Sequence, residues 1–289
     1  MPEARPNVHR RRLGSALRSL RRAAGLSMEE AADRLALSGK PTLSKIENGK
    51  QRVQGLALTA FLEVYGVREE ATRQAIKAMA TLAASGRRTS LLDEYREAVV
   101  TEGFEEYLHL EELACATEGY LTVVPGLLQT EDYALSIVER SQVWPSRREV
   151  ARFVELRMAR QAALTRETPL TFACILDEAA LRRVVGGRAV MKAQLERLLE
   201  VTEQRNNVDV RVLPFDVGAH ASSDGPFQLL HFSAGPPVVV IEGKTRSVYL
   251  EEAGDVDRYR SALDSLTEQT LPADQTRRFI SDLIKDCYS

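Results

Sequence analysis

The stretch from Leu13 to Tyr65 constrains the fold of this 289-residue chain most strongly, because its apolar residues are spaced as in a series of short helices. The first helix is predicted to end at Gly25, a residue type that commonly follows the last helical turn. Ser27 is predicted to begin a second helix, because Glu30 three residues later completes a capping box. The stretch therefore predicts short helices separated by tight turns.

A third helix is predicted directly after the second. Ser38 is its predicted N-cap, Pro41 falls in its first turn, where a missing N–H costs nothing, and Gly49 ends it. Two short helices joined by so tight a turn form a helix-turn-helix motif, whose second helix enters the major groove of DNA. The spacing predicts two further helices over 55–66 and 68–83. We therefore expect an all-α domain of five helices.

These residues resemble the Xre-type family of helix-turn-helix regulators, which includes the lambdoid repressor and Cro. The stretches that carry the resemblance are Leu20–Ser27, Ala31–Ala32 and Leu43–Gly49. The resemblance implies a transcriptional regulator that binds double-stranded DNA in a sequence-specific manner. It also implies a homodimer on a palindromic operator, with half-sites about 34–36 Å apart.

The family pattern assigns roles to side chains on the second and third helices. Base edges are expected to meet side chains near the start of the third helix: Lys40, Pro41, Thr42 and Lys45. Ser44 is expected close to the DNA backbone or a base, and Lys40 can reach either a base or a phosphate. The phosphate backbone is expected to meet the start of the second helix and the segment after the third: Ser27, Met28, Asn48, Lys50 and Arg52. Arg21 and Glu47 match positions that form a structural ion pair in this family. Taken singly, Lys40 and Lys45 are explained better as a solvated helix face.

The distribution of charge agrees with a DNA-binding N-terminus. The first 52 residues contain twelve Lys and Arg against five Asp and Glu, which gives this segment a net charge of +7. Because the whole chain carries −2, the remaining residues carry −9. Positive charge is therefore concentrated where phosphates would lie, and the rest of the chain repels DNA.

Composition divides the chain into four predicted parts. Residues 1–9 are expected to form a flexible arm, 10–84 the helix-turn-helix domain, 85–94 a polar linker, and 95–289 a second domain. Strand and helix patterns alternate in the second domain, which predicts an α+β or α/β fold, and we expect α+β. If the chain is a DNA-binding regulator, this domain is expected to dimerise and to sense a partner or ligand. Strands are expected near 118–124, 170–176, 208–213, 227–232, 237–242 and 247–251. Helices are expected within 91–115 and over 130–141, 146–164, 189–204, 255–270 and 272–288, with a shorter one after Asp177.

The second domain resembles the C-terminal domain of WhiJ-type actinomycete regulators. The stretches that carry this resemblance are Val124–Ala134, Leu176–Arg183, Leu213–Phe215, Gly218–His220, Asp224–Phe227 and Tyr249–Glu251. Such regulators often lie beside a gene for a very small protein, in antitoxin-like pairs that control development or secondary metabolism. The resemblance therefore implies control by a small protein partner, a small-molecule effector, or both.

Six residues of the second domain are candidates for contacting that effector or partner: Pro125, Leu128, Gln129, His220, Asp224 and Phe227. The segment around Pro125 is most simply a tight turn between strand and helix, and a wall of an effector pocket is the alternative. The loop over 216–225 holds a histidine, hydroxyls and carboxylates, but catalytic triads are normally assembled from distant segments. Ligand contact and a purely structural loop both explain it better than catalysis does.

Several classes of protein are disfavoured. The three cysteines and four histidines are dispersed without metal-ligand spacing, so we expect no metal and no other cofactor. No phosphate-cradling glycine loop is present, and we expect no enzymatic activity. The chain lacks a signal peptide and a membrane-length apolar run, which predicts a cytoplasmic protein. The alternative class is a cytoplasmic enzyme or interaction adaptor that keeps a degenerate helix-turn-helix for docking.

Overall fold

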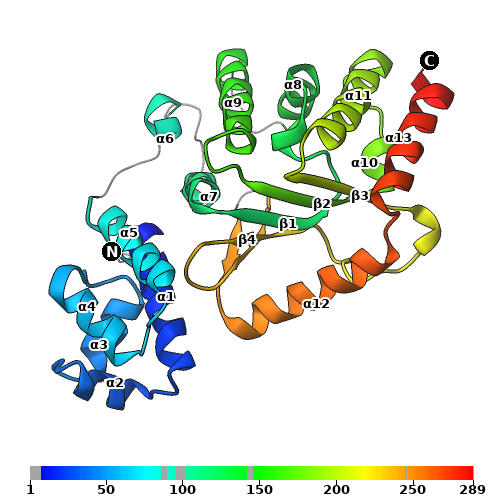
Figure 1. Ribbon diagram of the computed structural model, residues 1–289. Coiled ribbons are helices and arrows are strands. Elements are labelled where there is room, and N and C mark those ends of the chain that lie inside the picture. Colours follow the sequence, from blue (N-terminus) through cyan, green and yellow to red (C-terminus); the bar gives the residue numbers. More distant parts are fainter. Residues whose placement is uncertain (1–7, 86–89, 96–101, 142–145, 245, 289) are drawn as a thin grey trace. The chain divides into compact units, whose positions relative to one another are not determined.

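The computed structural model describes most of the chain, and the described ranges are 8–85, 90–95, 102–141, 146–244 and 246–288. These residues form two compact units, and the helices of the first are blue to cyan in Figure 1. The first unit contains 8–85 and the loop 232–237, and the second contains the other described residues. The prediction assigned 232–237 to the second domain, but Ala234 belongs to the buried apolar cluster of the first unit.

The first unit is a bundle of five helices, as the sequence predicts. Their bounds are α1 Val8–Ala23, α2 Met28–Arg34, α3 Lys40–Glu47, α4 Gly55–Val64 and α5 Glu70–Ser85. The core is built from one apolar face of each helix and includes Leu17, Leu43, Leu62 and Ile76, none more than 1% exposed. Val8 and His9, predicted to lie in the flexible arm, are instead the first residues of α1, and His9 is buried. Residues 1–7 of that arm lie outside the described ranges.

Two glycines allow α1 and α3 to approach each other closely. A Cβ atom on Gly14 of α1 would lie 2.5 Å from the carbonyl oxygen of Glu47, so no larger residue fits there. Gly49 ends α3 with φ +69°, a backbone conformation that favours glycine. A Cβ atom on Gly49 would also meet the backbone of Arg11 at 2.8 Å. The end of α3 is therefore held directly against the backbone of α1.

The predicted N-cap of α3 is wrong by one residue. Gly39 occupies the N-cap position with φ +113°, and no side chain caps the helix. The Ser38 hydroxyl instead lies 2.6 Å from the Thr42 hydroxyl. The glycine backbone turns the chain in a way that places Ser38 beyond reach of the first free N–H groups of the helix. The α3 helix therefore depends on Pro41 and on packing rather than on a side-chain cap.

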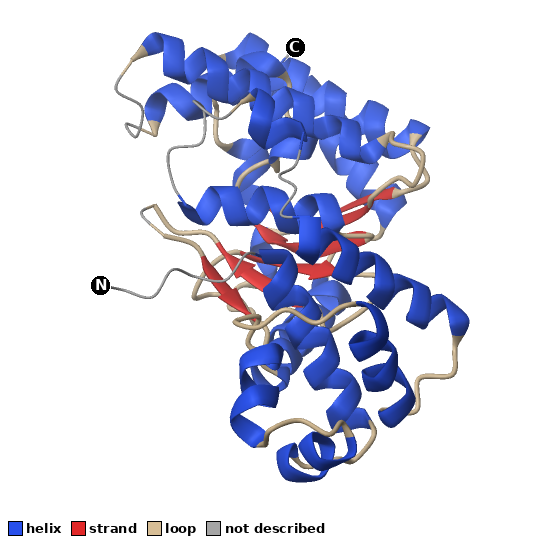
Figure 2. Cartoon of the chain, turned by 90° about the vertical axis from the view of Figure 1, so that its left-hand side faces the viewer, coloured by secondary structure: helices blue, strands red, loops and turns tan. Residues whose placement is uncertain are grey.

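The second unit is built on one mixed sheet of six strands, coloured red in Figure 2. The strand bounds are β1 Ala116–Leu121, β2 Thr171–Asp177, β3 Val208–Leu213, β4 Phe227–His231, β5 Val238–Ile241 and β6 Val248–Leu250. The strand order is β3-β2-β1-β4-β5-β6, with β1, β2 and β3 parallel and β4, β5 and β6 joined by antiparallel pairs. The sheet with its helices confirms the expected α+β class.

Helices cover both faces of this sheet (Figure 1). The helices of the second unit are α6 Ser90–Glu94, α7 Glu102–Leu113, α8 Glu131–Arg140, α9 Arg147–Ala159, α10 Glu178–Arg182, α11 Arg188–Gln204, α12 Ala253–Gln269 and α13 Ala273–Tyr288. Short 3-10 turns are η2 Gly126–Leu128, η3 Arg160–Leu164 and η4 Phe215–Val217. One face packs against α12 through Tyr120, Phe227 and Leu266, and α7, α8, α9 and α11 lie on the other face.

Local signals placed most of these elements correctly. Thr130 and Asp177 cap α8 and α10 as predicted, Ser146 caps α9 where a helix was expected to begin, and β3 has the predicted bounds. The helix expected over 146–164 is instead α9 followed by η3. In the predicted linker, 86–89 lie outside the described residues and 90–94 form α6. None of the helices that the structure describes is long and apolar enough to cross a membrane.

Candidate functional site

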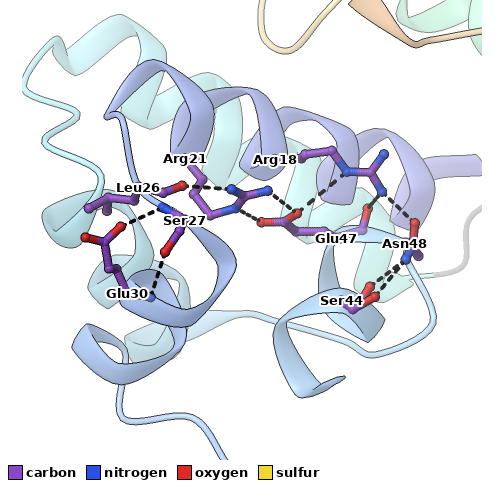
Figure 3. A network of polar contacts seen from close by, with 8 residues as sticks. All are labelled: Arg18, Arg21, Leu26, Ser27, Glu30, Ser44, Glu47 and Asn48. Atoms are coloured by element: carbon purple, nitrogen blue, oxygen red, sulfur yellow. Dashed lines mark hydrogen bonds and ion pairs between the residues drawn. The ribbon is translucent and has the colours of Figure 1, made fainter. Parts of the chain in front are cut away.

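The start of α2 is held by the predicted capping box. The backbone N–H of Ser27 donates to Glu30 Oε2 at 2.9 Å, and the backbone N–H of Glu30 donates to Ser27 Oγ at 3.2 Å (Figure 3). The hydrogen bond from the Ser27 backbone lowers the pKa of Glu30. Ser27 is exposed and Met28 half-buried, so the N-terminus of α2 faces solvent with its free N–H groups.

The pair expected between Arg21 and Glu47 is present, and it is bidentate. Arg21 Nε donates to Glu47 Oε1 at 2.7 Å, and Nη2 donates to Oε2 at 3.1 Å (Figure 3). Arg21 Nη1 also donates to the Leu26 carbonyl at 2.8 Å. The hydrogen bond to Glu47 raises the pKa of Arg21. Both side chains are buried, so this network ties α1, the α1–α2 turn and α3 together.

The α3 helix presents an exposed face with two lysines. Lys40, Pro41 and Lys45 are exposed, and Thr42 and Ser44 are half-buried. Lys40 Nζ lies 3.0 Å from Glu29 Oε1 on α2, and both side chains are more than half exposed. Lys45 makes no ion pair within the part of the chain that the structure describes. The sequence assigned the two lysines the same role, but their surroundings differ. Lys40 has an acidic neighbour, and Lys45 has no ion-pair partner among the described residues.

The residues expected to contact phosphates also differ from one another. Lys50 and Arg52 follow α3 and are exposed. Asn48 is held locally, because its Nδ2 donates to the Ser44 carbonyl at 2.8 Å and its Oδ1 accepts from Arg18 Nη2 at 2.5 Å. The Asn48 side chain thus closes the end of α3 and joins it to α1 (Figure 3). Sequence reasoning missed Arg18, which carried no signal beyond its place in a basic run.

The second unit contains a cavity of about 330 Å³ on the sheet face that packs against α7 and α9. Phe172, Gln228 and Val240 line it from the sheet. Side chains along a strand point alternately to the two faces of a sheet. Each of the three lies an odd number of residues from a residue of its own strand that packs against α12, so it points to the opposite face. The other lining residues are Phe104, Tyr107, Leu121, Thr122, Val123, Val124, Pro125, Gly126, Leu127, Gln129, Ile137, Arg157, Arg160, Pro226, Phe227 and Glu242.

Two arginines line this cavity, and their environments differ. Arg160 donates to both oxygens of Glu111 at 2.9 and 2.7 Å, and all of these groups are buried. Burial opposes ionisation, but the pairing with Glu111 outweighs it and raises the pKa of Arg160. Among the described residues, Arg157 Nη1 donates to Gln129 Oε1 alone, at 2.9 Å, and the buried Nε of Arg157 has no acceptor. Burial, followed by the charge of Arg160, lowers the pKa of Arg157 to about 10.

The side chain of Gln129 holds the guanidinium group of Arg157 in its orientation. It is 2% exposed, and its Nε2 donates to the Val124 carbonyl at 2.7 Å, which directs Oε1 toward the guanidinium. The backbone carbonyl oxygen of Gln129 accepts a hydrogen bond from Gln161 Nε2, also at 2.7 Å. Among the residues predicted to contact an effector, Pro125, Gln129 and Phe227 line the cavity, whereas Leu128 is fully buried in the core.

The other two candidates, His220 and Asp224, do not line this cavity. His220 Nδ1 accepts from the Ser222 backbone N–H at 3.2 Å, and Nε2 lies 3.5 Å from the Tyr120 hydroxyl. Tyr120 in turn donates to Asp177 Oδ2 at 2.7 Å. The Ser222 hydroxyl donates to the Gly225 carbonyl, so it does not face the imidazole as a nucleophile would. The loop is held by local hydrogen bonds.

The exposed α3 face, the bidentate Arg21–Glu47 pair and the separate α+β unit define a helix-turn-helix DNA-binding protein with a C-terminal domain. A family model described as "Helix-turn-helix domain" matches residues 12–76. A second model, described as "Domain of unknown function (DUF5753)", matches residues 104–282, and the chain belongs to that family. Both matches agree with the resemblances seen in the sequence. Comparison with the curated proteins and with the solved structures gave no match.

Proposed function

We propose that this protein is a sequence-specific transcriptional regulator, which binds a palindromic operator as a homodimer. The observation that carries the proposal is the exposed face of α3, on which Lys45 has no ion-pair partner among the described residues while the buried Arg21–Glu47 pair holds the helix in place. A rigid helix with a free cation is suited to reading guanine in the major groove. Lys50 and Arg52 then supply contacts to phosphates.

The second domain provides the control in this proposal. A small effector or a small protein partner binds it and shifts the regulator between states of different operator affinity, as in antitoxin-like pairs. The cavity beside α9 supports the small-effector alternative, because its volume lies in the range of small-molecule sites. The proposal includes no enzymatic activity, and the local hydrogen bonds of Ser222 and His220 support this.

The test of DNA recognition compares two lysine variants. Operators are selected from random duplex DNA with the wild-type protein, and gel shifts then measure affinity for the selected and for single-base-altered sequences. Lys45→Ala is expected to lose about 1–3 kcal/mol of discrimination at one base pair. Lys77→Ala, an exposed lysine on α5, makes the same charge change outside the proposed interface. Wild-type discrimination in the Lys45 variant would contradict the base contact.

The homodimer is tested by sedimentation of the protein with and without operator. A dimer is expected on DNA whose half-sites are about 34–36 Å apart, one helical turn. Operator affinity is also expected to fall linearly with the logarithm of salt concentration, because bound phosphates release counterions. A monomer bound to a non-palindromic site would contradict the dimer while leaving DNA recognition intact.

A further inference from the structure

The cavity of the second unit has the walls of a small-molecule site. Aromatic side chains enclose it on two sides, with Phe104 and Tyr107 from α7 and Phe172 from β2. Phe172 is 2% exposed and Tyr107 is 5% exposed, so these walls belong to the packed core and are preformed. Such walls favour a ligand with an apolar or aromatic body.

The charges that line or face the cavity do not balance in its interior. Arg160 is neutralised by its two hydrogen bonds to Glu111. Glu242 also lines the cavity and its charge favours the protonated form of Arg157, but its side chain is exposed and forms no ion pair with that arginine. Arg157 has no carboxylate within ion-pair distance in the described ranges, and its one hydrogen-bond partner there is the neutral side chain of Gln129. Among the described residues, one positive charge of the cavity therefore has no carboxylate in direct contact.

Arg157 is half-buried with its Nε atom fully buried, and a positive charge that is withdrawn from water without a partner is unfavourable. Here the surrounding structure maintains it: Gln129 fixes the guanidinium on one side, and Phe153 packs on it with 5.1 Å between the guanidinium carbon and the ring centre. Gly126 leaves the space beside both arginines open, because a Cβ there would lie 3.5 Å from Arg157 and 3.6 Å from Arg160. The arginine is thus held in a fixed position next to open space.

We propose that this cavity binds a small organic anion, with Arg157 as the counter-charge for its acidic group and the aromatic walls around its apolar body. The inference deepens the effector control proposed above, and only its consequence for DNA binding rests on that proposal. The volume of about 330 Å³ limits the ligand to small-molecule size and does not admit a folded partner protein.

Two fluorescent dyes of nearly the same shape test the charge requirement on the full chain. Anilinonaphthalene sulfonate carries an anionic group, and N-phenylnaphthylamine lacks it. Both dyes are titrated against wild-type protein and against Arg157→Met, which keeps the length of the side chain and removes its charge. We expect the variant to bind the sulfonate at least about tenfold more weakly and the neutral dye within about twofold of wild type, because a charge-assisted hydrogen bond is lost.

The matched control is Arg148→Met, an exposed arginine on the same helix α9 that does not line the cavity. It is expected to bind both dyes as wild type does. Arg157→Lys retains a positive charge in place of the planar guanidinium, and we expect an intermediate loss for the sulfonate. Equal binding of the sulfonate by Arg157→Met and Arg148→Met would overturn the proposal. An equal loss of both dyes in Arg157→Met would also overturn it, since shape rather than charge would then decide binding.

A competition experiment on the wild-type protein keeps the test valid if Arg157→Met fails to fold. Phenylpropionate is expected to displace the bound sulfonate dye, and phenylpropionamide of the same shape is expected to be at least about tenfold weaker. Equal displacement by the acid and the amide would overturn the anion site. These titrations contain no DNA, so a failure of the anion site is distinguishable from a failure of operator binding in the gel shifts.

Discussion

Arg21 and Glu47 form a buried, bidentate ion pair between α1 and the last residue of α3, with Nε–Oε1 2.7 Å and Nη2–Oε2 3.1 Å. A second arginine, Arg18, places its Nε 3.6 Å from Glu47 Oε2. Arg21 and Glu47 are both buried, so their charges are not available for contacts with DNA. The ion pair instead fixes the position of α3 against α1 (Figure 3), and the side of α3 that carries Lys40 and Lys45 is exposed.

Glu47→Ala is expected to destabilise the first unit by about 3–5 kcal/mol, because it leaves the Arg21 guanidinium buried without its partner. The measurement is urea denaturation. Glu63→Ala is the control: Glu63 pairs with Arg73 at 2.7 Å but is 67% exposed, so the loss is expected to stay below about 1 kcal/mol. Similar losses in both variants would mean that the buried pair contributes no more than a surface ion pair does.

Ser27→Ala and Ser38→Ala test which serine caps a helix. Ser27 caps α2 and exchanges two hydrogen bonds with Glu30, so its replacement is expected to cost about 1 kcal/mol of unfolding free energy. Ser38 precedes the N-cap Gly39 and bonds only to the Thr42 hydroxyl, so its replacement is expected to change stability by less than about 0.5 kcal/mol. The reverse order of the two losses would restore Ser38 as a cap.

Glu29→Gln is expected to strengthen binding to any DNA duplex, because Glu29 pairs with Lys40 at 3.0 Å in the free protein and competes with phosphate. An exposed ion pair is worth about 0.2–1 kcal/mol, so the gain in affinity is at most about fivefold at low salt. Gel shifts at several salt concentrations measure it. Glu70→Gln, an exposed position on α5, controls for the change in net charge, and an equal gain there would exclude a local effect of the pair.

Binding of the sulfonate dye is expected to weaken as pH rises through about 10, whereas binding of the neutral dye stays constant. Burial, followed by the charge of Arg160, lowers the pKa of Arg157 to about 10, so the guanidinium loses its proton earlier than an ordinary arginine. Titration of both dyes between pH 8 and about 11 measures this. The bound anion favours the charged form and moves the midpoint upward.

Other groups around Arg157 do not explain such a change. Burial raises the pKa of Tyr133 to about 12 and holds that of Tyr107 well above its ordinary value, so both phenols stay neutral near pH 10. Pairing with Glu111 raises the pKa of Arg160, which therefore stays charged. Arg157→Met is the control and is expected to show no transition near pH 10. A transition of the same size in this variant would assign it to another group.

The sequence alone determined the elements that depend on neighbours within a few residues. The capping box of Ser27 and Glu30 was predicted because both partners lie in one helical turn, and β3 was predicted from its strict alternation. The ion pair of Arg21 and Glu47 spans 26 residues, and it was found only because the chain resembles a known family. The same local logic failed at Ser38, where the choice between two adjacent candidates depends on a backbone angle of Gly39.

Only the tertiary structure decided which charges are free and which are paired. In the sequence, Arg157 and Arg160 are two of several arginines on one charged helix, and the charge pattern does not distinguish them. Arg160 pairs with Glu111, which lies 49 residues earlier in the chain, and Arg157 donates a hydrogen bond to the uncharged Gln129, 28 residues earlier. Whether a charge has a counter-ion depends on which side chains folding brings within a few ångströms, and local sequence patterns do not encode that distance.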